Sequence, residues 1–141
     1  MQTKTTVTRK LTVSAAKAWQ AVAAIGGLHV WFPNLSSCVV EGNGVGAIRR
    51  IELVHGGKIV DHITGIEPDK MRLSYHRVES PFPVTSYFGT VEIFESFDGL
   101  GVVVWTIDFE SAAEDSKPLS DLLAAGIATG IEGMRDDLAA R

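Results

Sequence analysis

The 141-residue sequence predicts a single α+β domain in which a strongly curved antiparallel sheet wraps around one long helix at the C-terminus. Three observations lead to this prediction: strand-like runs with a period of two, turn residues between those runs, and a final helical segment with no strand after it. A chain of this length usually builds one hydrophobic core, so we expect one domain over residues 1–141.

The first elements are a strand and two short helices. Residues of Thr3–Val13 alternate between two faces in a run rich in threonine and valine, which predicts a strand with one buried face. Ser14 then offers a side-chain cap to an alanine-rich helix over Ala15–Ile25, which a pair of glycines ends. A second short helix is expected over Leu28–Phe32. Pro33 should end it, because a proline disfavours helical backbone in the residue before it.

Six further strands are predicted in close succession, separated by glycine, proline and asparagine turns, which favours an antiparallel meander. They cover Leu35–Glu41, Ala47–His55, Lys58–Ile66, Arg72–Val78, Thr85–Phe97 and Gly101–Glu110. The last segment is a helix that we expect Ser116 or Lys117 to cap, with Pro118 in its first turn, and that should run to about Ala140. Such a helix extends about 34 Å, which is long enough to cross a whole sheet.

Three glycines, Gly126, Gly130 and Gly133, fall inside this last helix, where each costs about 1 kcal/mol relative to alanine. Two alternatives account for them. Either the helix packs closely against its neighbours, or the missing side chains leave a cavity open between the helix and the sheet.

Composition excludes several classes of protein. With 13 Lys and Arg against 17 Asp and Glu, and a net charge of -4, the chain lacks the basic character of a nucleic-acid-binding protein. No apolar run approaches the roughly 18 residues of a membrane span, and the N-terminus has no apolar signal segment, so we expect a soluble, cytoplasmic protein without stable membrane insertion. The single cysteine, Cys38, precludes an internal disulfide, and the histidines match no zinc-site spacing, so neither a metal nor a cofactor is expected. The oligomeric state stays open, with a homodimer as one alternative.

The order of elements, together with seven short stretches of sequence, carries a family resemblance. The stretches are Val13–Trp19, Leu28–Pro33, Gly44–Arg49, Asp61–Ile63, Arg72–Tyr75, Pro83–Tyr87 and Val102–Trp105. In this order the chain resembles the START-like superfamily, also called SRPBCC, and most closely its polyketide cyclase/dehydrase and lipid-transport group. The resemblance implies a helix-grip fold with a hydrophobic cavity between sheet and long helix. It also implies that the cavity receives a small hydrophobic molecule such as a lipid or polyketide, which some members cyclise and many only bind or carry.

Strand parity, carried over from this resemblance, predicts which residues of two neighbouring strands face the cavity. They are Arg49, Ile51, Leu53, Ile59, Asp61 and Ile63. A carboxylate between two isoleucines must be paired, protonated or at a wet pocket mouth, because burying an unpaired charge is costly. Arg49 is the expected partner of Asp61 if the strand register permits. Two alternatives stay open. The strand could have the opposite parity, with Val60 and His62 inside, or Asp61 could be exposed on a solvated face.

Aromatic residues complete the expected site. Tyr75 and Tyr87 are expected to point inward, where their hydroxyls either orient a ligand or find partners within the core. The remaining residues expected to line the cavity or pack beside it are Trp31, Phe32, Trp105, Ile127 and Gly130.

Three functional hypotheses follow. The first is a binding or carrier module for a small hydrophobic ligand. The second is a polyketide cyclase or aromatase-like enzyme in which Asp61 or His62 is the general base and Tyr75 or Tyr87 donates to a developing enolate oxygen. The third is a protein-interaction module, for which an exposed apolar patch near Trp31 and Phe32 would be the sign.

Overall fold

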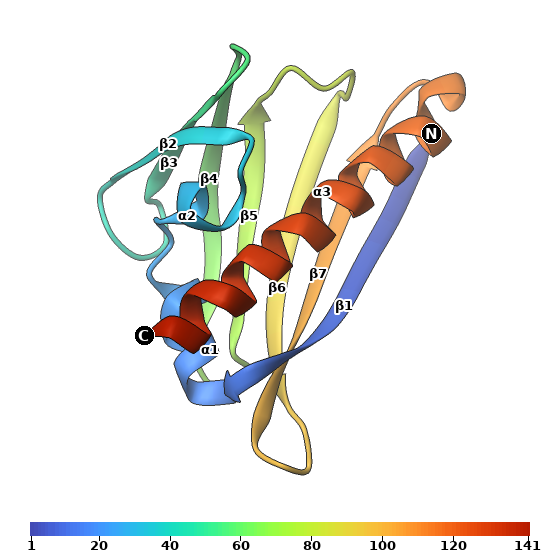
Figure 1. Ribbon diagram of the computed structural model, residues 1–141. Helices are drawn as coiled ribbons and strands as arrows, with labels where there is room; N and C mark the ends of the chain where they lie inside the picture. The colour runs from blue at the N-terminus through green and yellow to red at the C-terminus, as the bar shows by residue number, and fades with distance from the viewer.

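The computed structural model describes residues 1–141 and shows a seven-stranded antiparallel sheet curved around a long C-terminal helix (Figure 1). The strands are β1 (Gln2–Ser14), β2 (Leu35–Glu41), β3 (Ile48–Leu53), β4 (Lys58–Glu67), β5 (Arg72–Glu79), β6 (Ser86–Glu95) and β7 (Leu100–Glu110). The helices are α1 (Ala15–Ala23), α2 (Leu28–Trp31) and α3 (Ala113–Ala140). The predicted α+β helix-grip arrangement, with two short helices between the first two strands, is confirmed.

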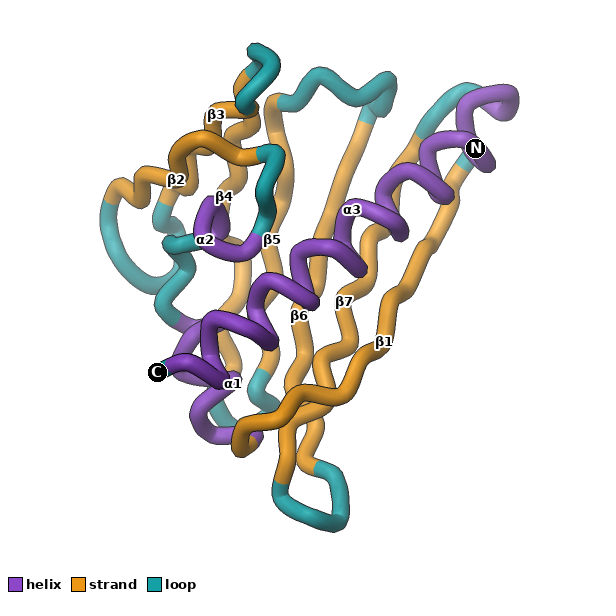
Figure 2. The backbone as a smooth tube through the Cα atoms, viewed as in Figure 1, coloured by secondary structure: helices purple, strands orange, loops and turns teal.

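The sheet is a meander of six strands, and the first strand is added at one edge. Its order is β1-β7-β6-β5-β4-β3-β2, so consecutive strands from β2 to β7 lie side by side and β1 pairs with β7. Helix α3 runs diagonally across one face of the sheet, and its C-terminal end lies near α1 and α2 (Figure 2). Helix α2 contacts both α3 and β2.

The junction between β1 and the helices follows the predicted cap but ends differently. The Ser14 side chain accepts a hydrogen bond from the Lys17 backbone N–H at 3.1 Å, as expected for an N-cap. Helix α1 ends at Ala23, two residues before the predicted end. The cause lies at Ile25, which adopts a left-handed φ of 70°. This backbone is rare for a β-branched residue, and here the Ile25 side chain is buried.

Helix α3 begins at Ala113, three residues before Ser116, the earlier of the two predicted caps. Two acidic residues, Glu114 and Asp115, stand in its first turn, where they interact favourably with the helix dipole. Ser116 does not cap the helix; it is buried, and its hydroxyl lies 2.7 Å from the Thr3 hydroxyl of β1. Pro118 therefore stands in the second turn, where the helix loses one backbone hydrogen bond and continues.

The hydrophobic core lies between the sheet and the helices. On β7 every second residue is buried, as the period of two predicts. Cys38 is partly buried against this core and is a free thiol. No helix of the protein has both the length and the apolar character needed to span a membrane.

Candidate functional site

A cavity of about 270 Å³ lies between the sheet and α3. Thirteen of its sixteen lining residues are hydrophobic, which is the usual character of a small-molecule site. Eight residues expected to face the cavity line it: Phe32, Ile51, Leu53, Ile59, Tyr75, Tyr87, Trp105 and Ile127. The sequence did not single out Leu122, Leu123 and Arg77 as lining residues, although all three contribute to the wall.

The three helix glycines have different surroundings, so both alternatives considered for them occur. Gly126 lines the cavity, and a Cβ built there meets no atom within 4 Å. A Cβ at Gly130 would overlap the ring of Phe32, and one at Gly133 would overlap the backbone of Trp31. The expectation that Gly130 borders the ligand cavity is therefore wrong, because Phe32 fills the space in front of it.

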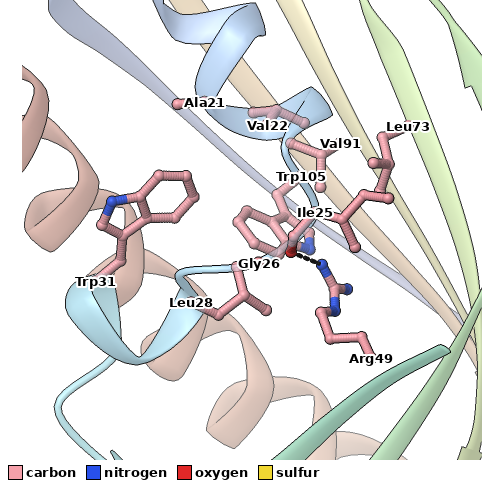
Figure 3. A pocket seen from close by; sticks show the side chains of 10 residues that line it. All are labelled: Ala21, Val22, Ile25, Gly26, Leu28, Trp31, Arg49, Leu73, Val91 and Trp105. Carbon is pink, nitrogen blue, oxygen red and sulfur yellow. Dashed lines mark hydrogen bonds between the residues drawn. The ribbon is translucent and has the colours of Figure 1, made fainter. Parts of the chain in front are cut away.

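Trp31 borders a separate, much smaller space of about 10 Å³, shown in Figure 3, which is room for about one water molecule. Arg49 also lines this space, and its Nη1 donates to the Ile25 carbonyl at 2.9 Å. Trp31 is only 4% exposed, and its Nε1 donates to Asp137 at 2.9 Å. Trp31 itself is therefore not exposed, although its neighbour Val30 is 57% exposed.

The predicted ion pair between Arg49 and Asp61 is present. The strand register places the two residues opposite each other on β3 and β4. The Asp61 carboxylate is 0% exposed, and its Oδ2 accepts from Arg49 Nε at 3.1 Å. Neither Asp61 nor the buried Ile63 lines the 270 Å³ cavity. The same parity exposes His62 on the outer face, so the hypothesis that His62 acts as a base inside the cavity is wrong.

A second arginine, Arg77 on β5, holds the other side of Asp61. Its Nε donates to Oδ1 at 2.8 Å and its Nη2 donates to Oδ2 at 3.2 Å, which makes a bidentate pair. The Arg77 side chain is 10% exposed and lines the cavity. The sequence signal for it was its spacing of two from Tyr75. That spacing places Arg77 on the same face of β5 as Tyr75, and the β4 to β5 register then sets it opposite Asp61.

The two arginines determine the charge state of Asp61. Burial alone would raise the pKa of this carboxyl, but Arg77 and then Arg49 outweigh burial and lower it below the usual value of 3.8. Asp61 therefore stays ionised, doubly paired and away from the cavity. This arrangement makes it a poor proton acceptor and argues against the proposed role as general base.

Both tyrosines lie against this cluster. The Arg49 guanidinium stands 4.9 Å from the centre of the Tyr75 ring, and that of Arg77 stands 4.6 Å from the centre of the Tyr87 ring. Trp105 Nε1 donates to the Tyr75 hydroxyl at 3.1 Å, which leaves the hydroxyl proton free to donate. Burial is the main cause that raises the pKa of Tyr75 and of Tyr87, so both stay neutral at neutral pH.

An alkaline titration will report on this cluster alone, because Tyr75 and Tyr87 are the only two tyrosines. We expect the native protein to form less tyrosinate at about pH 10 than denatured protein, because a free tyrosine is half ionised there. Because the pKa values of both tyrosines are raised in the folded protein, their neutral side chains contribute fully to stability below about pH 10. This contribution is lost as the pH rises through the folded pKa values. Near-ultraviolet absorbance of native and denatured protein measures the difference, and identical curves would contradict the burial described here.

Comparison with known proteins agrees with this geometry. Residues 2–141 match the family model described as polyketide cyclase/dehydrase and lipid transport. No curated protein matches the chain. Among solved structures, the protein XoxI from Bacillus cereus has a TM-score of 0.86 at 20% identity and covers 96% of this chain and 95% of its own. An uncharacterized protein from Bacillus thuringiensis has a TM-score of 0.83 at 20% identity, covering 97% of this chain and 99% of its own.

A third structure, from Thermobifida fusca, has a TM-score of 0.84 at 23% identity and covers 97% of this chain and 93% of its own. At these identities the three structures share the fold with this chain. The family itself follows from the model that matches almost every residue. The chain belongs to the polyketide cyclase/dehydrase and lipid transport family.

Proposed function

We propose that this protein binds or carries a small hydrophobic molecule in the cavity between the sheet and α3. The observation that carries the proposal is the mostly apolar lining of a 270 Å³ space with a few polar groups gathered at one place. Membership of a family described by lipid transport and polyketide cyclisation supports the same role.

The cavity volume limits the size of the ligand. A cavity of about 150 Å³ holds a benzene molecule. A space of about 270 Å³ therefore suits an apolar body of about one or two rings, or an aliphatic group of similar bulk. Larger ligands would have to extend through the opening.

The opening lies where exposed residues line the cavity. These are Asn34, Leu122 and Gly126, and the Leu122 side chain is 60% exposed. A ligand would therefore enter between α3 and the segment that follows α2, and the absence of a side chain at Gly126 keeps this passage open.

The lining favours binding over catalysis. Its residues include no aspartate, glutamate, histidine, lysine or cysteine, so a bound substrate would meet no side chain suited to act as a general base. Tyr87 remains able to donate a hydrogen bond to a ligand oxygen. The cyclase alternative would require a base supplied by the substrate or by water.

A ligand screen tests the proposal. Native mass spectrometry and thermal shift with lipids, polyketide-like aromatics and aliphatic compounds of graded size should identify bound species and raise the melting temperature, since a ligand that binds only the folded state stabilises it. Failure of every apolar class to bind would overturn the proposal.

Gly126→Leu should block the cavity without unfolding the protein. The new side chain would start where no atom lies within 4 Å, so we expect a loss of ligand affinity of about tenfold or more with little change in stability. Ala125→Leu is the matched control, because Ala125 is exposed on the same helix and does not line the cavity. Equal ligand affinity for both variants, measured by calorimetry, would place the binding site elsewhere.

A further inference from the structure

The polar end of the cavity, formed by Tyr75, Arg77 and Tyr87, carries a positive charge that no protein group balances. Arg49 and Arg77 share Asp61 as their one carboxylate partner, so the buried cluster has a net charge of +1. No lining residue is acidic, and both tyrosine hydroxyls stay neutral. Because a buried charge without a counter-charge is costly, this end of the cavity favours an occupant with one negative charge.

Arg77 is the group that such an occupant meets. It lines the cavity, whereas Arg49 does not. Its Nε and Nη2 are bonded to Asp61, but Nη1 makes no hydrogen bond to the protein, although nine-tenths of the side chain is buried. The Tyr75 hydroxyl has a free proton as well, because it accepts from Trp105. The cavity thus offers hydrogen-bond donors from a guanidinium and from a phenol, and none of its lining residues carries a negative charge.

We infer that the ligand is a small amphipathic carboxylate whose head group binds Arg77 and whose apolar body extends toward the opening at Gly126. This inference rests on the proposed ligand-binding function and adds the chemical class of the ligand. A guanidinium suits a carboxylate because its planar N–H groups match the two oxygens. The apolar body would lie against Ile51 and Ile127, which line the cavity from the sheet and from α3.

Charge count favours a monoanion over a phosphate monoester. One carboxylate brings the cluster from +1 to zero. A phosphate monoester carries about −1.5 to −2 at neutral pH, so it would leave excess negative charge in the same buried place.

Three ligands with the same two-ring body test the inference on the unmodified protein: 1-naphthoate, the neutral 1-naphthalenemethanol and 1-naphthyl phosphate. Calorimetry at neutral pH should show that 1-naphthoate binds about tenfold or more tightly than the alcohol, because a hydrogen bond to a charged group is worth more than one between neutral groups. It should also bind more tightly than the phosphate. Equal affinity for acid and alcohol would overturn the inference while leaving the proposed function intact, and no binding by any of the three would count against both.

Arg77→Met locates the effect. This variant should lose the preference for the acid and keep its affinity for the alcohol, whereas Arg50→Met, an exposed arginine on β3, should keep both. If Arg77→Met does not fold, nitrogen-15 NMR of the arginine side chains in the unmodified protein gives the answer. The Arg77 signals should shift with 1-naphthoate and those of Arg50 should not. A preference that survives in Arg77→Met, or an acid that leaves the Arg77 signals unmoved, would overturn the inference.

Discussion

Asp61→Ala is expected to destabilise the protein by about 3–5 kcal/mol, because it leaves two arginines in the interior without their shared counter-charge. Arg49 is 3% exposed and Arg77 is 10% exposed, so neither charge is well hydrated once the carboxylate is gone. Urea unfolding of the two proteins, with circular dichroism as the signal, measures the difference in the free energy of unfolding.

Apolar replacement of the partners should restore stability in steps. Arg49→Met combined with Asp61→Leu still leaves Arg77 unpaired, so we expect it to recover only part of the loss. Adding Arg77→Met removes the last buried charge and should recover most of it. Additive effects of the single changes would contradict a coupled cluster.

The same cluster should make stability depend on acid. The folded pKa of Asp61 lies below its ordinary value of 3.8, so its stabilisation is present above about pH 4 and is lost as pH falls through the folded pKa. Asp61→Asn should therefore be less stable than the unmodified protein at neutral pH, and the gap should narrow on acidification. A constant gap across the acid range would contradict the lowered pKa.

Gly133→Ala is expected to destabilise the protein by about 3 kcal/mol, because the added methyl would lie 2.8 Å from the Trp31 carbonyl carbon and 2.9 Å from its Cα. These are backbone atoms of α2, which cannot rotate away as a side chain can. Helix propensity alone would favour alanine by about 1 kcal/mol, so the expected sign is set by the close packing of α2 on α3. Thermal and urea unfolding measure the change.

Gly126→Ala is the matched control for this prediction. The same substitution on the same helix meets no atom within 4 Å, so it should stabilise the protein by up to about 1 kcal/mol. If the two variants changed stability in the same direction, the described contrast between a packed and an open glycine would be wrong.

Local patterns predicted most of the fold because each of them acts within a few residues. Alternation of apolar residues located the strands, and Ser14 marked the start of α1 through its own hydrogen bond. The start of α3 was harder to predict from the sequence. Ser116 and Pro118 are typical of a helix start, but the Ser116 hydroxyl is used instead in a contact with Thr3, more than one hundred residues away in sequence.

Only those parts of the site that depend on strand parity could be predicted from the sequence. Parity correctly suggested the pair of Arg49 and Asp61, because residues facing each other on a hairpin share a face. Arg77 shares a face with Tyr75, but its pairing with Asp61 depends on the β4 to β5 register, which shifts between Val60 and Asp61. The difference between Gly126 and Gly130 could not be read from a helix alone, since it depends on where Phe32 lies.

The claim that the cavity between the sheet and α3 binds the ligand is tested most directly by locating a bound small apolar molecule. Intermolecular NOEs between bound 1-naphthoate and the protein should connect its rings to the methyl groups of Ile51, Leu123 and Ile127, which surround the cavity from both sides. Val39 lies exposed on β2 and does not line the cavity, so its methyl groups should show none. NOEs to Val39 without any to the three cavity residues would contradict the claim that the space between the sheet and α3 is the binding site.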